Sequence, residues 1–161
     1  MTTHAGTGLM IDAEALKKSV QGKKVLIDSN IIIYLTEETA PYHDLSLELF
    51  SMIEQGSASA VISILTVAEV MSGPLRAGKS DVAMTVKNYL MNFPNIHCQQ
   101  TTAEVLDMVG RDERVNWQTL RHLDALIIAS GLYAQVDFFI SNDRRFISSL
   151  PAEIMLSYIS A

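Results

Sequence analysis

Four acidic residues in this chain each stand beside an apolar segment, which is an unusual setting for a charge. Asp28 ends the run Lys24-Val-Leu-Ile-Asp28, Glu69 follows the run 59–64, Asp124 opens the apolar stretch 121–135, and Asp143 follows the run 137–141 by two residues. Carboxylates that share a pocket repel one another, and Mg²⁺ or Mn²⁺, which prefer oxygen ligands, relieve that repulsion. We therefore predict that these four residues bind one divalent metal site.

The pattern of apolar residues predicts the elements that carry these acids. Runs of four to six apolar residues predict strands, and a spacing of three to four predicts helices. Strands are expected at 24–28, 59–64, 96–99, 137–141 and 154–159, helical turns at 29–35, and helices at 9–21, 44–55, 66–73, 80–92, 101–115 and 121–135. The alternation predicts a three-layer α/β/α domain with a five-stranded, mostly parallel sheet.

Such a sheet gathers distant residues at one edge. The carboxyl ends of parallel strands and the amino ends of the following helices meet there, and ligands bind in that crevice. Asp28 and Asp143 follow strands, whereas Glu69 and Asp124 are expected in first turns of helices. Helix amino ends also favour phosphate. The chemistry expected at this edge is therefore hydrolysis of a phosphodiester by a metal-activated water.

Each acid also has a structural alternative. Thr66-x-x-Glu69 fits a capping box, Asp124 would suit the dipole of a helix start, and Asn142-Asp143 is common in turns. Asp28 is harder to explain in this way, because a charge that ends a buried strand needs a partner. Thr101-x-x-Glu104 is a second capping box, which we interpret as purely structural.

Composition narrows the function. The chain has 161 residues, 48% of them apolar, which suits a single globular domain. Its formal charge of −6 argues against a module that holds nucleic acid by bulk attraction, but not against a nuclease whose acids are offset by metal. No apolar stretch reaches about 18 residues, and the first residues do not resemble a secretory signal. A cytoplasmic protein without membrane segments is expected.

Four segments, in this order, resemble the motifs of the PIN-domain ribonucleases, and in particular the VapC-like toxins of toxin–antitoxin pairs. They are Val25-Leu-Ile-Asp-Ser-Asn-Ile-Ile-Ile-Tyr-Leu35, Ile64-Leu-Thr-Val-Ala-Glu-Val70, Leu123-Asp-Ala-Leu-Ile-Ile-Ala129 and Phe139-Ile-Ser-Asn-Asp-Arg-Arg-Phe146. The resemblance spans about residues 23–160. It divides the chain into an N-terminal extension with a short helix, 1–22, and a PIN-like nuclease domain, 23–161.

The resemblance implies an activity and partners. A VapC-like protein is an endoribonuclease that cleaves single-stranded RNA with Mg²⁺ or Mn²⁺, often forms homodimers and is neutralised by a cognate antitoxin. The acids it designates are those that topology selects, and it adds Asn30 and Ser141 as groups that orient the carboxylates. Basic residues near the acids are candidate RNA contacts: Arg76, Lys79, Arg121, Arg144 and Arg145.

Other functions remain open at this point. A haloacid-dehalogenase-type phosphatase would have Asp-x-Asp after the first strand, whereas this chain has Asp28-Ser-Asn30. A PIN-domain nuclease of RNA processing would share all four acids with a toxin. A catalytically silent PIN scaffold would be expected to lack one or more of them, and none is lacking here.

Overall fold

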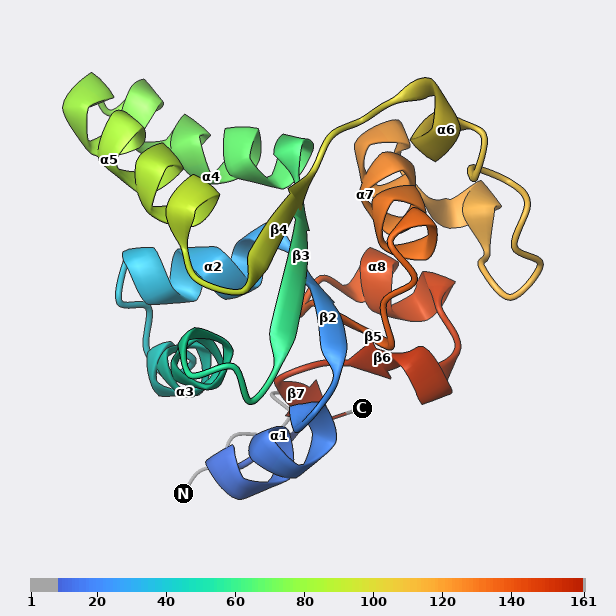
Figure 1. Cartoon of the computed structure of the whole chain (residues 1–161), viewed down its shortest axis with the longest axis horizontal. Coiled ribbons are helices and arrows are strands. Elements are labelled where there is room, and N and C mark those ends of the chain that lie inside the picture. The colour runs from blue at the N-terminus through green and yellow to red at the C-terminus, as the bar shows by residue number, and fades with distance from the viewer. Residues whose placement is uncertain (1–8, 161) are drawn as a thin grey trace.

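The computed structural model describes residues 9–160 of the chain (Figure 1). Its central sheet has five strands in the order β4-β3-β2-β5-β6, and all neighbouring strands are parallel. The strands are β2 (Lys24–Ile27), β3 (Ser59–Ser63), β4 (Ile96–Gln99), β5 (Phe138–Ile140) and β6 (Met155–Leu156). The predicted α/β fold with a five-stranded parallel sheet is confirmed.

Helices cover both faces of this sheet. They are α1 (Ala13–Val20), α2 (Ser29–Thr36), α3 (His43–Glu54), α4 (Ile64–Arg76), α5 (Ser80–Asn92), α6 (Ala103–Leu106), α7 (His122–Tyr133) and α8 (Arg144–Ser149), with 3₁₀ turns η1 at Trp117–Thr119 and η2 at Ala152–Ile154. In Figure 1, α2 to α5 lie on one side of the strands and α7 and α8 on the other.

The core has two parts, one on each face of the sheet. Val25 and Ile27 of β2 pack with α1 to α5, whereas Leu26, between them, packs with Ile127 and Ile128 of α7. Side chains alternate across a strand, so a strand covered on both faces is apolar throughout. This explains the uninterrupted Val-Leu-Ile run that precedes Asp28.

Two predicted helices were wrong in extent. The helix expected to break near Gly73-Pro74 continues to Arg76, since Pro74 lies in its last turn, where only one hydrogen bond is lost. The helix expected at 101–115 is limited to α6, which Thr102 rather than Thr101 caps, its hydroxyl accepting from the Val105 amide at 3.3 Å. The predicted capping box of Thr101 therefore does not form.

The secondary structure near the two ends of the described chain also differs from the prediction. The expected strand 154–159 is divided into η2, β6 and β7 (Ile159–Ser160), and helix α8 was not predicted. Residues 9–10, expected in a helix, form β1 (Leu9–Met10), which pairs antiparallel with β7. Two-residue strands carry too few residues for an alternating pattern to be visible. Within residues 9–160, no helix is long and apolar enough to cross a membrane.

Candidate metal centre

The site lies at the carboxyl ends of β2 and β5, where the strand order reverses. After β2 the chain adds β3 and then β4 on one side, and it then crosses over to place β5 on the other side of β2. A crevice forms at such a switch point, because the two connections leave in opposite directions. Asp28 directly follows β2, and Ser141 directly follows β5. The fold thus supplies a ligand-binding position where the sequence places carboxylates.

Asp28 is the most enclosed of the four acids, with 4% of its surface exposed. It caps helix α2, its Oδ1 accepting from the Ser29 amide at 2.8 Å. Its Oδ2 accepts from the Ser141 hydroxyl at 2.6 Å and from Asn30 Nδ2 at 3.1 Å. Burial raises the pKa of Asp28 despite these hydrogen bonds, and the charges of Asp124 and Asp143 raise it further. A cation bound nearby would favour its ionised form.

Glu69 lies in the second turn of α4, one turn later than predicted. The cap of α4 is Ser63, whose hydroxyl oxygen accepts from the Leu65 amide at 3.1 Å, so the capping box considered as a structural alternative for Thr66 and Glu69 does not form. Oε1 of Glu69 is buried and has no hydrogen-bond partner within residues 9–160. Burial and the charge of Asp28 raise the pKa of Glu69, and a hydrogen bond with Ser29 partly offsets this. Helix capping therefore does not explain why a partly buried glutamate stands at this position.

Asp124 is the third residue of α7 and is also largely buried. Its Oδ2 finds no hydrogen-bond partner in the described part of the chain, although Arg121 Nε lies 3.6 Å away in a loose ion pair. Burial raises the pKa of Asp124, and the charge of Asp143 adds to the effect. The expected position in a first turn is confirmed.

Asp143 is half-buried and caps helix α8, its Oδ1 accepting from the Arg145 amide at 2.9 Å. Its own amide donates to the Ser141 hydroxyl at 3.0 Å. Asp28 and Asp143 are therefore both helix caps, a role that the sequence analysis did not predict. Carboxylates at helix amino ends are stabilised by the helix dipole, so two of the four acids have a structural role besides any chemical one.

The four acids influence one another electrostatically. Asp28 is affected by Asp124 and Asp143, Glu69 by Asp28 and Asp124, and Asp124 by Asp143. Buried carboxylate oxygens without partners are a donor set that suits Mg²⁺ or Mn²⁺. No three His, Cys, Asp or Glu residues among the described ones converge on a single ion position. Mg²⁺ often takes only one or two carboxylates and keeps several waters, so the residues fit such an ion.

Asn30 and Ser141 form the base of the site. Asn30 Nδ2 donates to Asp28 Oδ2 and, at 3.2 Å, to the Ser141 hydroxyl. Asn30 Oδ1 accepts from the amide of Asn142 at 3.0 Å. Because Ser141 also contacts the Asp143 amide, these two side chains connect the acid after β2 with the acid before α8.

The predicted basic residues fall into two groups. Arg121 pairs with Asp124, and Arg145 is close enough for its charge to lower the pKa of Asp124; Arg144 is exposed beside it. Arg76 and Lys79 are exposed at the junction of α4 and α5. Arg76 is seven positions after Glu69 in α4, about 10 Å along the helix axis. Arg121 and Arg145 are thus the ones beside the acids.

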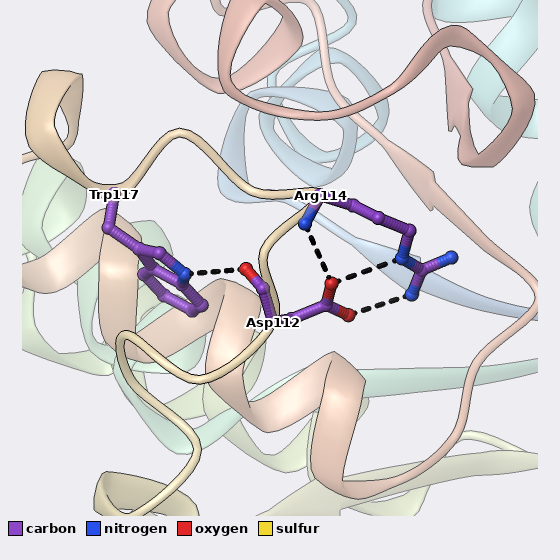
Figure 2. Close-up of polar contacts among 3 residues, drawn as sticks. All are labelled: Asp112, Arg114 and Trp117. Carbon is purple, nitrogen blue, oxygen red and sulfur yellow. Dashed lines mark hydrogen bonds and ion pairs between the residues drawn. The ribbon is translucent and has the colours of Figure 1, made fainter.

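The loop before α7 has its own hydrogen bonds, which Figure 2 shows. Asp112 accepts from the Arg114 amide at 3.0 Å and from its guanidinium at 3.1 and 2.8 Å, while the Trp117 indole donates to the Asp112 carbonyl at 2.9 Å. Val115 and Trp117 also pack in the core beneath α7. This loop therefore fixes the entry to α7, where Arg121 and Asp124 lie.

Residues 25–149 match the family model described as PIN domain, and the chain belongs to the PIN-domain family. The resemblance found in the four sequence motifs is thereby confirmed. No curated protein matches the sequence significantly.

Several solved structures share the fold. VapBC2 from Rickettsia felis, bound to a DNA fragment from its promoter, has a TM-score of 0.64 at 13% identity, covering 84% of this chain and 98% of that one. DNA-bound VapBC from Salmonella typhimurium has a TM-score of 0.61 at 14% identity, covering 84% of this chain and 98% of that one. Mycobacterium tuberculosis VapC20, described as a toxin that cleaves the sarcin–ricin loop, has a TM-score of 0.58 at 15% identity. The match covers 81% of this chain and 98% of that one.

Proposed function

We propose that this protein is a metal-dependent endoribonuclease that hydrolyses phosphodiester bonds of single-stranded RNA, and that it is the toxin of a toxin–antitoxin pair. One observation carries the activity. Asp28 is an almost fully buried carboxylate at the switch point of the sheet, and Glu69 and Asp124, which interact with it, each have a buried oxygen without a hydrogen-bond partner. A structure built only for stability would have paired these oxygens or replaced the acids.

In this proposal Asp28, Glu69, Asp124 and Asp143 together would hold Mg²⁺ or Mn²⁺, one or two of them directly and the others through waters of the ion. The ion would activate a water and stabilise charge on the leaving oxygen of the phosphodiester. Ser141 and Asn30 keep Asp28 oriented through their hydrogen bonds to Oδ2. The raised pKa of Asp28 means that this carboxyl holds its proton more tightly than usual, so metal and proton compete for it.

Arginine side chains would bind the RNA backbone beside the metal. Arg121 and Arg145 border Asp124, and Arg144 is exposed next to Arg145. Guanidinium groups bind phosphate oxygens in pairs, which would place the backbone next to the acids. Arg76 and Lys79, at the far end of α4, would contact RNA farther from the cleaved bond.

The role as a toxin rests on similarity in fold to VapC proteins, several of them solved as complexes with their antitoxin. We propose that a cognate antitoxin covers the site and that the protein forms a homodimer. We also propose that it acts in the cytoplasm, on cytoplasmic RNA. We also retain the division into an extension, 1–22, and a nuclease domain, 23–161.

A cleavage assay with a growth assay tests this proposal. Purified protein should cut unstructured RNA with Mg²⁺ or Mn²⁺ and stop when EDTA is added. Its expression should arrest growth, and co-expression of the proposed cognate antitoxin should restore it. Asp28→Asn is the matched control and should neither cleave RNA nor arrest growth. Cleavage that continues in EDTA would exclude the metal mechanism, and active protein that leaves growth unaffected would exclude the toxin role.

A further inference from the structure

The side chain of Asn142 attaches the turn that carries Asp143 to the C-terminal segment, in addition to the backbone hydrogen bond from the Ser141 amide to the Leu156 carbonyl at 3.2 Å. Oδ1 of Asn142 accepts two backbone hydrogen bonds, from the amides of Tyr158 at 2.9 Å and Ile159 at 3.3 Å. Its Nδ2 donates to the Tyr34 hydroxyl at 3.3 Å. Asn142 lies between Ser141 and Asp143, so whatever holds Asn142 also sets the position of both neighbours.

Tyr158 gives this attachment a rigid base. Its side chain is fully buried, and its hydroxyl is 2.9 Å from that of Ser46, which donates to the Ile31 carbonyl at 2.7 Å. Its ring packs with Tyr34 and Tyr42, at centroid distances of 6.1 and 6.3 Å. A side chain with this many contacts cannot move without disturbing the core.

The N-terminal extension closes the arrangement. The Ile11 amide donates to the Tyr158 carbonyl at 2.8 Å, and β1 pairs with β7 through Leu9–Ser160 and Met10–Ile159. Helix α1, which follows, is anchored by Leu16 and Val20, both fully buried. Segments from both ends of the described chain thus meet next to Asn142 and hold the backbone to which it is bonded.

We propose that residues 9–11, Tyr158 and Asn142 form a clamp that positions Asp143, with Asn142 as a positioning residue for the reaction. The clamp itself does not depend on the proposed nuclease function, but the role of Asn142 in the reaction rests on it. Residues that support metal ligands through hydrogen bonds commonly change activity when replaced. The clamp would also give the extension a role in the site, although its residues lie outside the sheet.

The first test is amide hydrogen exchange of the metal-free protein, which needs no RNA cleavage. The reporters are the amides of Asp143 and Arg145, which donate within the turn. Asn142→Ala should speed their exchange about tenfold or more, as local opening becomes easier. Asn142→Asp keeps the Oδ1 acceptor and should restore much of the protection. Tyr34→Phe removes only the partner of Nδ2 and should have a smaller effect.

The second test separates the extension from simple packing. Ile11→Pro removes the N–H that donates to Tyr158, whereas Ile11→Ala keeps it and shortens the side chain. The clamp predicts faster exchange at Asp143 and Arg145 in Ile11→Pro but not in Ile11→Ala. Unchanged exchange at these amides in both Asn142→Ala and Ile11→Pro would overturn the proposal.

Activity provides an independent readout. Asn142→Ala should lower kcat roughly 10–100-fold with little change in KM, because it disturbs a ligand and not the RNA contacts. A change in KM alone would contradict a positioning role. Should the wild-type protein cleave no RNA, the proposed function fails, and the exchange experiments still decide whether the clamp exists.

Discussion

The Ser141 hydroxyl donates a 2.6 Å hydrogen bond to Oδ2 of Asp28, across 113 positions of sequence. The two residues follow β5 and β2, which are paired in the sheet, and both are buried. A hydrogen bond from a hydroxyl to an ionised carboxylate is short and strong. It fixes the orientation of the most enclosed acid in the site before any ligand arrives.

Replacing Ser141 should weaken both activity and folding. Ser141→Ala leaves Asp28 without its shortest hydrogen bond and the Asp143 amide without an acceptor. We expect cleavage to slow roughly 10–100-fold and the free energy of unfolding to fall by about 1–3 kcal/mol. Urea unfolding and steady-state kinetics measure the two effects. The control is Ser148→Ala, which changes an exposed serine in helix α8; equal behaviour of the two variants would contradict this role.

Substitutions of Glu69 and Ser63 should distinguish a catalytic role from a helix-capping role. Glu69→Gln should abolish metal-dependent cleavage with little loss of stability, since Glu69 caps no helix. Ser63→Ala removes the observed cap of α4 and should cost about 0.5–2 kcal/mol of unfolding free energy. Glu104→Gln is the control, because Glu104 is an exposed glutamate of helix α6. A fully active Glu69→Gln protein would remove Glu69 from the metal centre.

The pH dependence of stability should reverse its sign with metal. The pKa values of Asp28, Glu69 and Asp124 are raised, chiefly by burial, so the folded state binds protons more tightly than the unfolded chain. This contribution is full below the ordinary carboxyl pKa of about 4 and is lost as the pH rises through the raised values. The metal-free protein should therefore lose stability from these groups as the pH rises above about 4.

Added Mg²⁺ should oppose that trend, because its ligands must be deprotonated. Its stabilisation should grow with pH and reach about 2.7 kcal/mol at a concentration of 100 Kd. Urea unfolding between pH 4.5 and 8, with and without Mg²⁺, measures both slopes. Asp28→Asn should flatten the metal-free slope. A wild-type slope that is the same with and without Mg²⁺ would argue against carboxylate binding.

Gly131 makes a sharp packing prediction for α7. A Cβ at this position would lie 2.5 Å from Phe139 Cε2 and 2.9 Å from Leu26 Cδ1, both in the core. Gly131→Ala should therefore destabilise the fold by about 1–3 kcal/mol. Gly73→Ala in α4 is the control, as its Cβ would lie 3.4 Å from the flexible Glu37 side chain and not against the core. The higher helix propensity of alanine and the crowding of its Cβ by Pro74 oppose each other, so the change in stability should be within about 1 kcal/mol, and equal destabilisation by both would contradict the packing argument.

The parallel sheet, and the edge of it where the four acids lie, could be predicted from the sequence. The apolar run before Asp28 and the one before Ser141 are long enough to indicate buried strands, and topology then determines the edge. Local details were not predictable in this way. Ser63 caps α4 in place of Thr66, and Thr102 caps α6 in place of Thr101, because several hydroxyl residues near a helix start satisfy the same pattern.

Contacts between distant segments were the other part that the sequence could not supply. Nothing in the local sequence of Asn142 indicates that its side chain binds the backbone of Tyr158, 16 residues later. Turn propensity alone explains an asparagine at that position. The same holds for residues 9–11, whose pairing with β7 depends on where the two ends of the chain meet in the fold.

Binding of Mn²⁺ to the metal-free protein is the most direct test of the claim that Asp28, Glu69, Asp124 and Asp143 form one metal centre. Calorimetric or paramagnetic resonance titration of the wild type and of the four single amide variants, with Glu104→Gln as control, would measure it. We predict saturable binding to the wild type and the control, weakened at least about tenfold by each of the four substitutions. Unchanged Mn²⁺ affinity in Asp28→Asn would contradict the account.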